Sequence, residues 1–168
     1  MAIKLDLANA FDCVRHRFLF DVMYKMGFGK GLIKWIKACI SEPWIAPLVN
    51  GRAADFFKAS RGLRQGCPLS PLLFVIQAFV LSFYLNKKQQ EHAITRLCTA
   101  RGVKRINHAL FADDTLLLGA TTPQSTTNSK VVLDDFCKSS GSELNKGKCQ
   151  IFCWNIPAST ANSIARCL

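Results

Sequence analysis

The stretch His108-Ala-Leu-Phe-Ala-Asp-Asp-Thr-Leu-Leu-Leu-Gly119 decides the fold, because it sets two adjacent carboxylates between two apolar runs. The runs, Leu110-Phe111 and 116–118, are typical of short buried strands, which rarely carry charge without a reason. Successive residues of a strand point to opposite faces, so a continuous strand would bury one carboxylate. The pattern therefore predicts a hairpin with its tight turn at Asp113-Asp114.

Adjacent carboxylates at a hairpin tip repel each other, and a bound divalent cation is the usual remedy. The other interpretation is an ordinary polar turn, because Asp is common in turns. The pair taken alone favours the ordinary turn, so the rest of the chain has to decide.

The composition suits one domain with a hydrophobic core, since 49% of the 168 residues are hydrophobic. Lys and Arg total 22 against 11 Asp and Glu, a formal net charge of +11. This excess favours a polyanionic partner, nucleic acid before a membrane surface, although charge that only keeps the protein soluble has the same composition. The longest apolar run, 71–85, is short of a membrane span, and the N-terminus lacks a signal-peptide pattern. We expect an intracellular protein, in the nucleus or the cytoplasm, with free thiols and no membrane partner.

The first residues predict a strand that carries another carboxylate. Apolar residues at positions 3, 5 and 7 alternate with Lys4 and Asp6, which is typical of a half-buried strand with Asp6 at its end. If this strand lies beside the hairpin, Asp6 and Asp113 converge. Two hard cations held by shared carboxylates stabilise both the attacking and the leaving oxygen of a phosphoryl transfer. Oxygen-only ligation favours Mg²⁺, with Mn²⁺ as the alternative.

Helical spacing, turn residues and capping residues predict the remaining elements. We expect a helix capped at Asn9 and closed by Gly27, a second over 32–40, a hairpin turning at Asn50-Gly51, a helix capped by Ser70 and running to about Leu85, a loop or weak strand over 87–105, a helix from Thr122 to Gly141, a turn and strand over 144–154, and no structured ending beyond Pro157.

Four blocks of the sequence resemble, in order and spacing, motifs of reverse transcriptases, above all the kind encoded by non-LTR (LINE-type) retrotransposons. One four-residue match would be weak, but four ordered blocks over roughly 1–155 are strong. The resemblance implies an α+β polymerase palm, with an antiparallel sheet and helices packed on one face, over 1–155, and a C-terminal tail over 156–168. The blocks are Lys4-Leu-Asp-Leu-Ala-Asn-Ala-Phe-Asp12, Gly62-Leu-Arg-Gln-Gly-Cys-Pro-Leu-Ser-Pro-Leu-Leu-Phe74, Phe111-Ala-Asp-Asp114 and Ser140-Gly-Ser-Glu-Leu-Asn-Lys-Gly-Lys148.

The resemblance implies catalytic roles for four residues. Asp6 and Asp113 match the principal metal ligands of the family, and Asp114 matches the second, more variable carboxylate. Lys148 falls at the lysine proposed to protonate the leaving pyrophosphate. A solvated lysine is the alternative interpretation of Lys148.

The same resemblance implies a nucleotide-binding set. Phe11 falls where the family has an aromatic steric gate against the ribonucleotide 2′-hydroxyl, and core packing is the alternative. Gln65 lies where the family contacts the incoming nucleotide, and Gly66 lets the backbone approach closely. Arg64 belongs to the same glycine-bracketed loop before a helix, which suits phosphate or base contacts.

Departures from the family pattern also shape the expectation. Cys67 stands where many relatives have Asp, and Ser142 where the family usually has Leu, and neither change removes a catalytic group. The first motif begins almost at Met1 and little follows Trp154, so we expect an incomplete fingers region and no thumb, with those segments supplied by a longer product.

Three functions follow as hypotheses. The first is an RNA-directed DNA polymerase that joins a dNTP to a primer 3′-hydroxyl, with an RNA template and a DNA primer as partners. The second is a truncated, non-catalytic nucleic-acid-binding remnant of such a polymerase. The third, an unrelated two-metal nuclease or nucleotidyl cyclase, leaves the second and fourth blocks unexplained. The carboxylates favour the first hypothesis, and the missing fingers and thumb favour the second.

Overall fold

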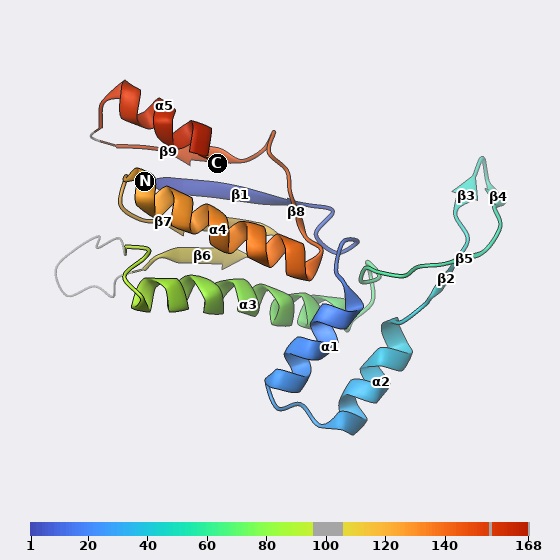
Figure 1. Cartoon of the computed structure of the whole chain (residues 1–168). Coiled ribbons are helices and arrows are strands. Elements are labelled where there is room, and N and C mark those ends of the chain that lie inside the picture. The colour runs from blue at the N-terminus through green and yellow to red at the C-terminus, as the bar shows by residue number, and fades with distance from the viewer. Residues whose placement is uncertain (96–105, 155, 168) are drawn as a thin grey trace.

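The computed structural model describes residues 1–95, 106–154 and 156–167, arranged as a sheet with helices packed against it (Figure 1). Part of the predicted loop over 87–105 lies outside these residues. The elements in chain order are β1 (Ala2–Ala8), α1 (His16–Lys25), α2 (Lys30–Ile40), β2 (Trp44–Ile45), β3 (Leu48–Val49), β4 (Arg52–Ala53), β5 (Phe57–Lys58), α3 (Ser70–Gln90), β6 (His108–Phe111), β7 (Asp114–Leu118), α4 (Pro123–Ser140), β8 (Glu143–Leu144), β9 (Gln150–Phe152) and α5 (Ala158–Cys167).

Strand β1 is the centre of the main sheet, and all of its pairings are antiparallel. It pairs with β7 on one side and with β8 and β9 on the other, and β6 pairs with β7. The register sets Ile3 opposite Leu117 and Asp6 opposite Asp114. The N-terminal strand therefore lies beside the hairpin, which is the arrangement that convergence of Asp6 and Asp113 requires.

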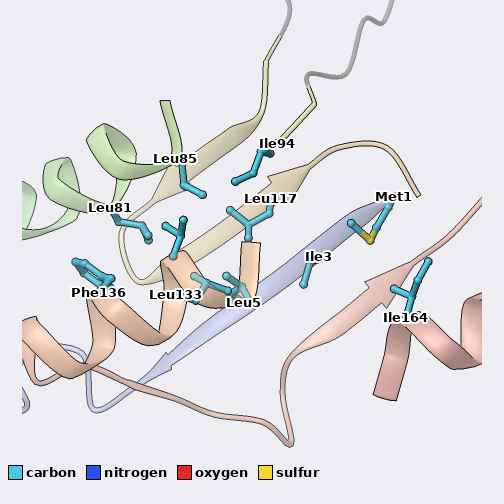
Figure 2. Packing of buried hydrophobic residues seen from close by; sticks show 11 residues of the cluster. Met1, Ile3, Leu5, Leu81, Leu85, Ile94, Leu117, Leu133, Phe136 and Ile164 are labelled. Atoms are coloured by element: carbon cyan, nitrogen blue, oxygen red, sulfur yellow. The ribbon is translucent and has the colours of Figure 1, made fainter. Parts of the chain in front are cut away.

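The hydrophobic core lies between one face of this sheet and the helices α3 and α4 (Figure 2). Ile3 and Leu5 of β1 are buried, whereas Lys4 between them is exposed. Leu81 of α3 and Phe136 of α4 belong to the same buried cluster. Burying apolar surface of this kind stabilises the fold by roughly 25 cal/mol per Å². On the opposite face Lys4 and Leu116 are exposed, whereas Ala2 and Leu118 near its end are buried, and we call this the open face. The predicted α+β architecture, with helices packed on one face, is confirmed.

Helix α3 is apolar on nearly all sides. It runs to Gln90, five residues past the predicted end at Leu85, and by length and composition alone it could cross a membrane. One side of it is buried against the domain, through Leu73, Leu81 and Leu85 among others. Another side leaves large apolar residues in solvent, among them Leu72, Val75, Phe79 and Phe83.

Helix α5 corrects the expectation that the chain has no structured ending beyond Pro157. Ile164 on this helix is fully buried and belongs to the main core cluster (Figure 2). Most residues around Ile164 are small or polar, so the sequence showed no clear apolar face for a helix here. Helix α4 forms as predicted: Thr122 Oγ1 accepts from the Ser125 amide at 3.2 Å, and Gly141 ends the helix in a left-handed conformation.

Two predicted helix starts are wrong. Asn9 begins a short turn, not the helix, and has φ +46, while α1 begins at His16. Ser70 is the first helical residue rather than the cap, because its buried hydroxyl donates to the Arg64 carbonyl at 2.7 Å.

The predicted hairpin at Asn50-Gly51 is confirmed: both residues have positive φ, 51° and 77°, as a type I′ turn requires. Six cysteines among the described residues are free thiols, as expected: Cys13, Cys39, Cys67, Cys137, Cys149 and Cys153.

Candidate active site

A cavity of about 410 Å³ at the end of β1 brings together residues that the sequence analysis singled out. Asp6 comes from β1, Asp113 from the β6–β7 turn, and Lys148 from the turn between β8 and β9. Phe11 and Gln65 line the same cavity. The predicted convergence of Asp6 and Asp113 in one pocket is therefore confirmed as geometry, and the roles assigned to these residues stay predictions.

The hairpin turn lies one residue earlier than predicted. Phe111 pairs with Asp114, so the two-residue loop is Ala112-Asp113 and not Asp113-Asp114. Ala112 has φ +52, a left-handed conformation at the first loop position, where type II′ turns usually have glycine. Asp113 therefore stands at the tip, and Asp114 is the first residue of β7.

The prediction grouped Asp114 with Asp6 and Asp113 as a metal ligand, but in the structure its carboxylate pairs with Lys4. Asp114 is cross-strand partner to Asp6, so both side chains project from the open face of the sheet. Lys4 projects from the same face, and its Nζ lies 3.3 Å from Asp114 Oδ1. Both side chains are about half exposed, so this ion pair contributes little to stability. Asp114 is not among the residues that line the cavity.

The segment after β1 holds Phe11 in the cavity wall. The Asn9 carbonyl accepts from the amides of Asp12 and Cys13, at 2.9 and 3.1 Å. The Phe11 ring then stacks on Phe74 of α3, with centroids 4.9 Å apart and planes 16° apart. Phe11 is half-buried, so one ring serves both interpretations: it packs on the core and it forms a flat wall of the cavity.

The loop that carries Gln65 is bonded to the same segment. The Gly62 amide donates to Val14 O and the Leu63 amide to Phe11 O, both at 2.8 Å. A Cβ on Gly62 would lie 2.8 Å from Asp12 O, so glycine permits this contact between backbones. These bonds hold Gln65 beside the carboxylates.

Arg64 and Gly66, from the same loop, do not line the cavity. Arg64 is exposed and contributes its carbonyl to Ser70, while Gly66 has φ +82 and open space around it. The predicted nucleotide-binding set is therefore divided: Phe11 and Gln65 lie at the cavity, whereas Arg64 and Gly66 lie outside its wall.

The turn that carries Lys148 is hydrogen-bonded to the backbone of Asp6. The Asn145 amide donates to Asp6 O at 2.9 Å, and the Lys148 and Cys149 amides donate to Asn145 O at 3.0 and 3.1 Å. Asn145 also lines the cavity, and the sequence analysis gave it no role. Its place beside the fourth-motif lysine, at the start of a turn, was the signal that could have found it.

A buried network of polar side chains lies next to the strand that leads to the Lys148 turn. Gln77, in the middle of apolar α3, is 1% exposed, and its Nε2 donates to Ser142 Oγ at 2.9 Å. Ser140 Oγ donates to the same oxygen at 3.0 Å and accepts from the Ser142 amide at 3.1 Å. Ser142, which stands where the family usually has Leu, directly precedes β8. The network therefore ties α3 and the end of α4 to the strand that leads to Lys148.

The donor atoms of the cavity fit a hard divalent cation by type, since Asp6 and Asp113 offer carboxylate oxygens. Within residues 1–95, 106–154 and 156–167, no group of three or more His, Cys, Asp or Glu side chains is arranged to hold a metal ion. The predicted three-carboxylate site of Asp6, Asp113 and Asp114 is therefore not assembled in this conformation, in which Asp114 pairs with Lys4.

An antiparallel sheet with helices on one face, and carboxylates gathered where β1 meets a hairpin, defines the class of polymerase palm domains. The model of the family described as "Reverse transcriptase (RNA-dependent DNA polymerase)" matches residues 1–164. The chain belongs to this family, and its relatives place it with the reverse transcriptases of non-LTR retrotransposons. Members of the family act on nucleic acid and use divalent metal ions.

Two relatives carry the retrotransposon assignment. The chain is 31% identical over 147 residues to a "Retrovirus-related Pol polyprotein from type-1 retrotransposable element R2" of Popillia japonica, covering 88% of this chain and 23% of that protein. It is 30% identical over 149 residues to the corresponding type-2 element R2DM polyprotein of Drosophila melanogaster, covering 87% and 13%. The chain thus spans less than a quarter of the length of either relative.

A solved structure supports the fold. Telomerase from Candida albicans, in complex with a fragment of telomeric RNA, superposes with a TM-score of 0.67 at 14% identity. The match covers 93% of this chain and 27% of the telomerase chain. At this identity the likeness concerns the fold alone.

Proposed function

We propose that the cavity is the nucleotidyl-transfer site of an RNA-directed DNA polymerase, with an RNA template, a DNA primer and a dNTP as substrates. The observation that carries the proposal is that Asp6 and Asp113, from separate parts of the chain, line one cavity together with Lys148. Membership of the reverse transcriptase family supports the choice of reaction.

Asp6 and Asp113 would hold Mg²⁺, or Mn²⁺ in its place, and Asp114 joins them once Lys4 releases it. Such ions, when bound, neutralise the triphosphate and lower the pKa of the attacking 3′-hydroxyl. Lys148 donates a proton to the leaving pyrophosphate, as a general acid. Gln65 orients the incoming nucleotide, and Phe11 offers a flat wall against a ribose 2′-hydroxyl. Arg64 and Gly66 lie outside the cavity wall in the same loop as Gln65, and we give them no separate step.

The decisive measurement is primer extension on poly(rA)/oligo(dT) with Mg²⁺ or Mn²⁺. We expect extension by the unaltered chain, loss of at least about 100-fold in Asp113→Asn, and no loss in the matched variant Asp55→Asn, whose carboxylate is exposed on the β4–β5 connection. Extension by Asp113→Asn at the unaltered rate would refute the assignment. Because longer relatives carry further segments, the same assay is run with the full reading frame that contains this chain.

A second candidate function is nucleic-acid binding without extension. The observation that favours it is that Asp114 is held by Lys4 and stands outside the cavity wall. Retained binding of an RNA–DNA duplex, with no primer extension, selects this function over the first.

A further inference from the structure

A second cavity, of about 490 Å³, opens between α1 and α3, and its lining residues are all different from those of the candidate active site. We call it the α1–α3 groove. Asp21, Lys25 and Ser139 are its polar lining residues, and the rest of the wall is apolar or aromatic. The apolar part of the wall consists of Phe18, Val22, Met26, Phe79, Val80 and Phe83, with Tyr84 beside them.

The apolar surface continues along the outer side of α3. Leu72, Val75, Phe79 and Phe83 are 64%, 64%, 51% and 54% exposed. Their spacing of three, four and four residues places them on one side of the helix, over about 16 Å at 1.5 Å per residue. This length equals about three helical turns. Other large apolar residues are also exposed, such as Trp35 and Phe111, but on α3 four of them share one side of a helix beside a cavity, and contiguous apolar surface of this kind marks an interaction site.

The two ends of the groove differ in charge. At one end Asp21 and Lys25 balance each other. At the other end the groove meets a cavity of about 320 Å³, with which it shares Tyr84 and Ser139. That cavity is lined by three lysines, Lys87, Lys88 and Lys138, and one acidic residue, Asp135. Lys88 also pairs with Glu91 at 2.8 Å, so Lys87 and Lys138 stand against Asp135 alone and this end of the groove is positive.

We propose that the α1–α3 groove docks an amphipathic α-helix of a partner protein, with the apolar face of the helix on Phe79 and Phe83. Acidic residues of that helix lie over Lys87 and Lys138. A helix that binds such a groove does so through its own apolar residues, spaced at i, i+3 or i+4 and i+7. A second copy of this chain is a poor occupant, since each copy has a net charge of +11 and the lysines would face like charge.

The test uses the full chain and a fluorescein-labelled peptide of about five helical turns, 18 residues long. The peptide carries leucine at i, i+3, i+7 and i+11 and glutamate at one end of the other face. Binding is followed by fluorescence anisotropy in EDTA, so that the result is independent of metal-dependent polymerase activity. A scrambled peptide of the same composition controls for simple attraction between opposite charges.

We expect the amphipathic peptide to bind at least about tenfold more tightly than the scrambled one. Phe79→Ala with Phe83→Ala should remove that preference. The matched change Phe56→Ala with Phe57→Ala, at 67% and 51% exposed residues of the β2–β5 ribbon, should leave it intact. Equal binding of both peptides, or an unchanged preference in the α3 variant, overturns the proposal.

Charge reversal tests the orientation of the helix. Lys87→Glu with Lys138→Glu should weaken the acidic peptide at least about tenfold and favour a peptide with lysine at the glutamate positions. The lysines could instead only stabilise the C-terminal ends of α3 and α4. In that case the charge reversal lowers the melting temperature but does not change the preference between the acidic and the basic peptide, and the proposed orientation of the docked helix is wrong.

Two other possible occupants of the groove, a second copy of this chain and a membrane surface, are tested in parallel. Sedimentation equilibrium of the unaltered chain should give a monomer, and a dimer that Phe79→Ala with Phe83→Ala dissociates would overturn the proposal. Co-sedimentation with phosphatidylcholine–phosphatidylserine vesicles should be insensitive to the same pair of changes. Vesicle binding that depends on Phe79 and Phe83 would assign the groove to a membrane surface instead.

Discussion

His108 forms hydrogen bonds through both of its ring nitrogens at the contact of β6 with α3. Its Nε2 lies 2.7 Å from Ser82 Oγ and its Nδ1 2.6 Å from Asn107 Oδ1. Asn107 Nδ2 donates to Leu85 O at 3.2 Å, so its Oδ1 is free to accept from Nδ1–H. The arrangement suits the neutral imidazole, with Nε2 accepting from the Ser82 hydroxyl, and burial lowers the pKa of His108 below its ordinary 6.5.

This lowered pKa gives stability a definite pH dependence. The unfolded chain binds a proton at His108 at higher pH than the folded chain does, so the contribution is complete above about pH 6.5. It is lost as the pH falls through the folded pKa, because protonation removes the acceptor at Nε2. We expect the free energy of unfolding, measured by urea titration, to fall between pH 7.5 and pH 5. In His108→Gln the free energy of unfolding should decrease less over this pH range. An equal decrease in the variant and the unaltered chain would contradict a role of His108.

At Gly62, both the backbone conformation and the small space around the residue favour glycine. It has φ +95, and a Cβ there would meet Asp12 O at 2.8 Å. Gly62→Ala should therefore lower the free energy of unfolding by about 2 kcal/mol or more, because both the strain and the clash fall on backbone atoms. Gly31→Ala is the matched control, since Gly31 lies in α2 with nothing within 4 Å.

The control should shift stability in the opposite direction. Alanine in a helix is favoured over glycine by roughly 0.5–1 kcal/mol, so Gly31→Ala should raise the midpoint of denaturant unfolding. Similar losses in both variants would mean that the contact of Gly62 with Asp12 does not limit the fold. Because Gly62 also fixes the loop that holds Gln65, its variant should lose nucleotide affinity along with stability.

At the scale of elements, the network of Gln77, Ser142 and Ser140 joins α3 and the end of α4 to the residue that precedes β8. Gln77 Oε1 has no hydrogen-bond partner in the part of the chain that the structure describes, so the network is incompletely satisfied. Ser142→Ala should cost about 1–3 kcal/mol, because it also leaves Gln77 Nε2 buried without an acceptor.

Replacing both partners should cost less than the sum of the single changes. Gln77→Leu with Ser142→Ala removes the polar pair together, and we expect a coupling of about 0.5–3 kcal/mol from a double-mutant cycle in urea. Independent, additive effects would show that the hydrogen bond does not couple α3 to β8. A backbone amide resonance of Asn145 that shifts in Ser142→Ala and returns in the double variant would show that the network positions the Lys148 turn.

Elements with a strong local pattern were predictable from the sequence, and those that depend on a single contact were not. Alternation in β1, Thr122 and Gly141 at the ends of α4, and the Asn50-Gly51 turn each carry their own signal. The β6–β7 turn was predicted one residue late, because its positive φ falls on Ala112, which local preference disfavours. Helix α5 was missed because, among its residues whose burial the structure describes, Ile164 is the one that is fully buried.

At the scale of the whole molecule, the sequence predicted that Asp6 and Asp113 converge if the first strand lies beside the hairpin, and the structure has that pairing and that convergence. The sequence did not predict that Lys4 holds Asp114 or that Asn145 faces the cavity, since both depend on which side chains share a face after the strands pair. Pairing register decides such contacts, and register is a property of the folded sheet.

Net charge and its distribution predict how the molecule binds nucleic acid. With a formal charge of +11, most of the affinity for an RNA–DNA duplex should come from release of counterions, which makes binding fall steeply with salt. Each phosphate contact that is lost should reduce the slope of log K against log[salt] by about 0.9. Lys148 lines the cavity, and in the absence of a nucleotide we expect it to contact a phosphate of a duplex that lies there. Lys148→Gln should then reduce the slope by about one, whereas Lys30→Gln, at the exposed start of α2, should leave it nearly unchanged. Anisotropy titrations of a labelled duplex between 50 and 300 mM KCl measure both slopes. Equal slopes for the two variants would mean that the duplex does not lie over the cavity, and that the basic surface binds it without using the open face of the sheet.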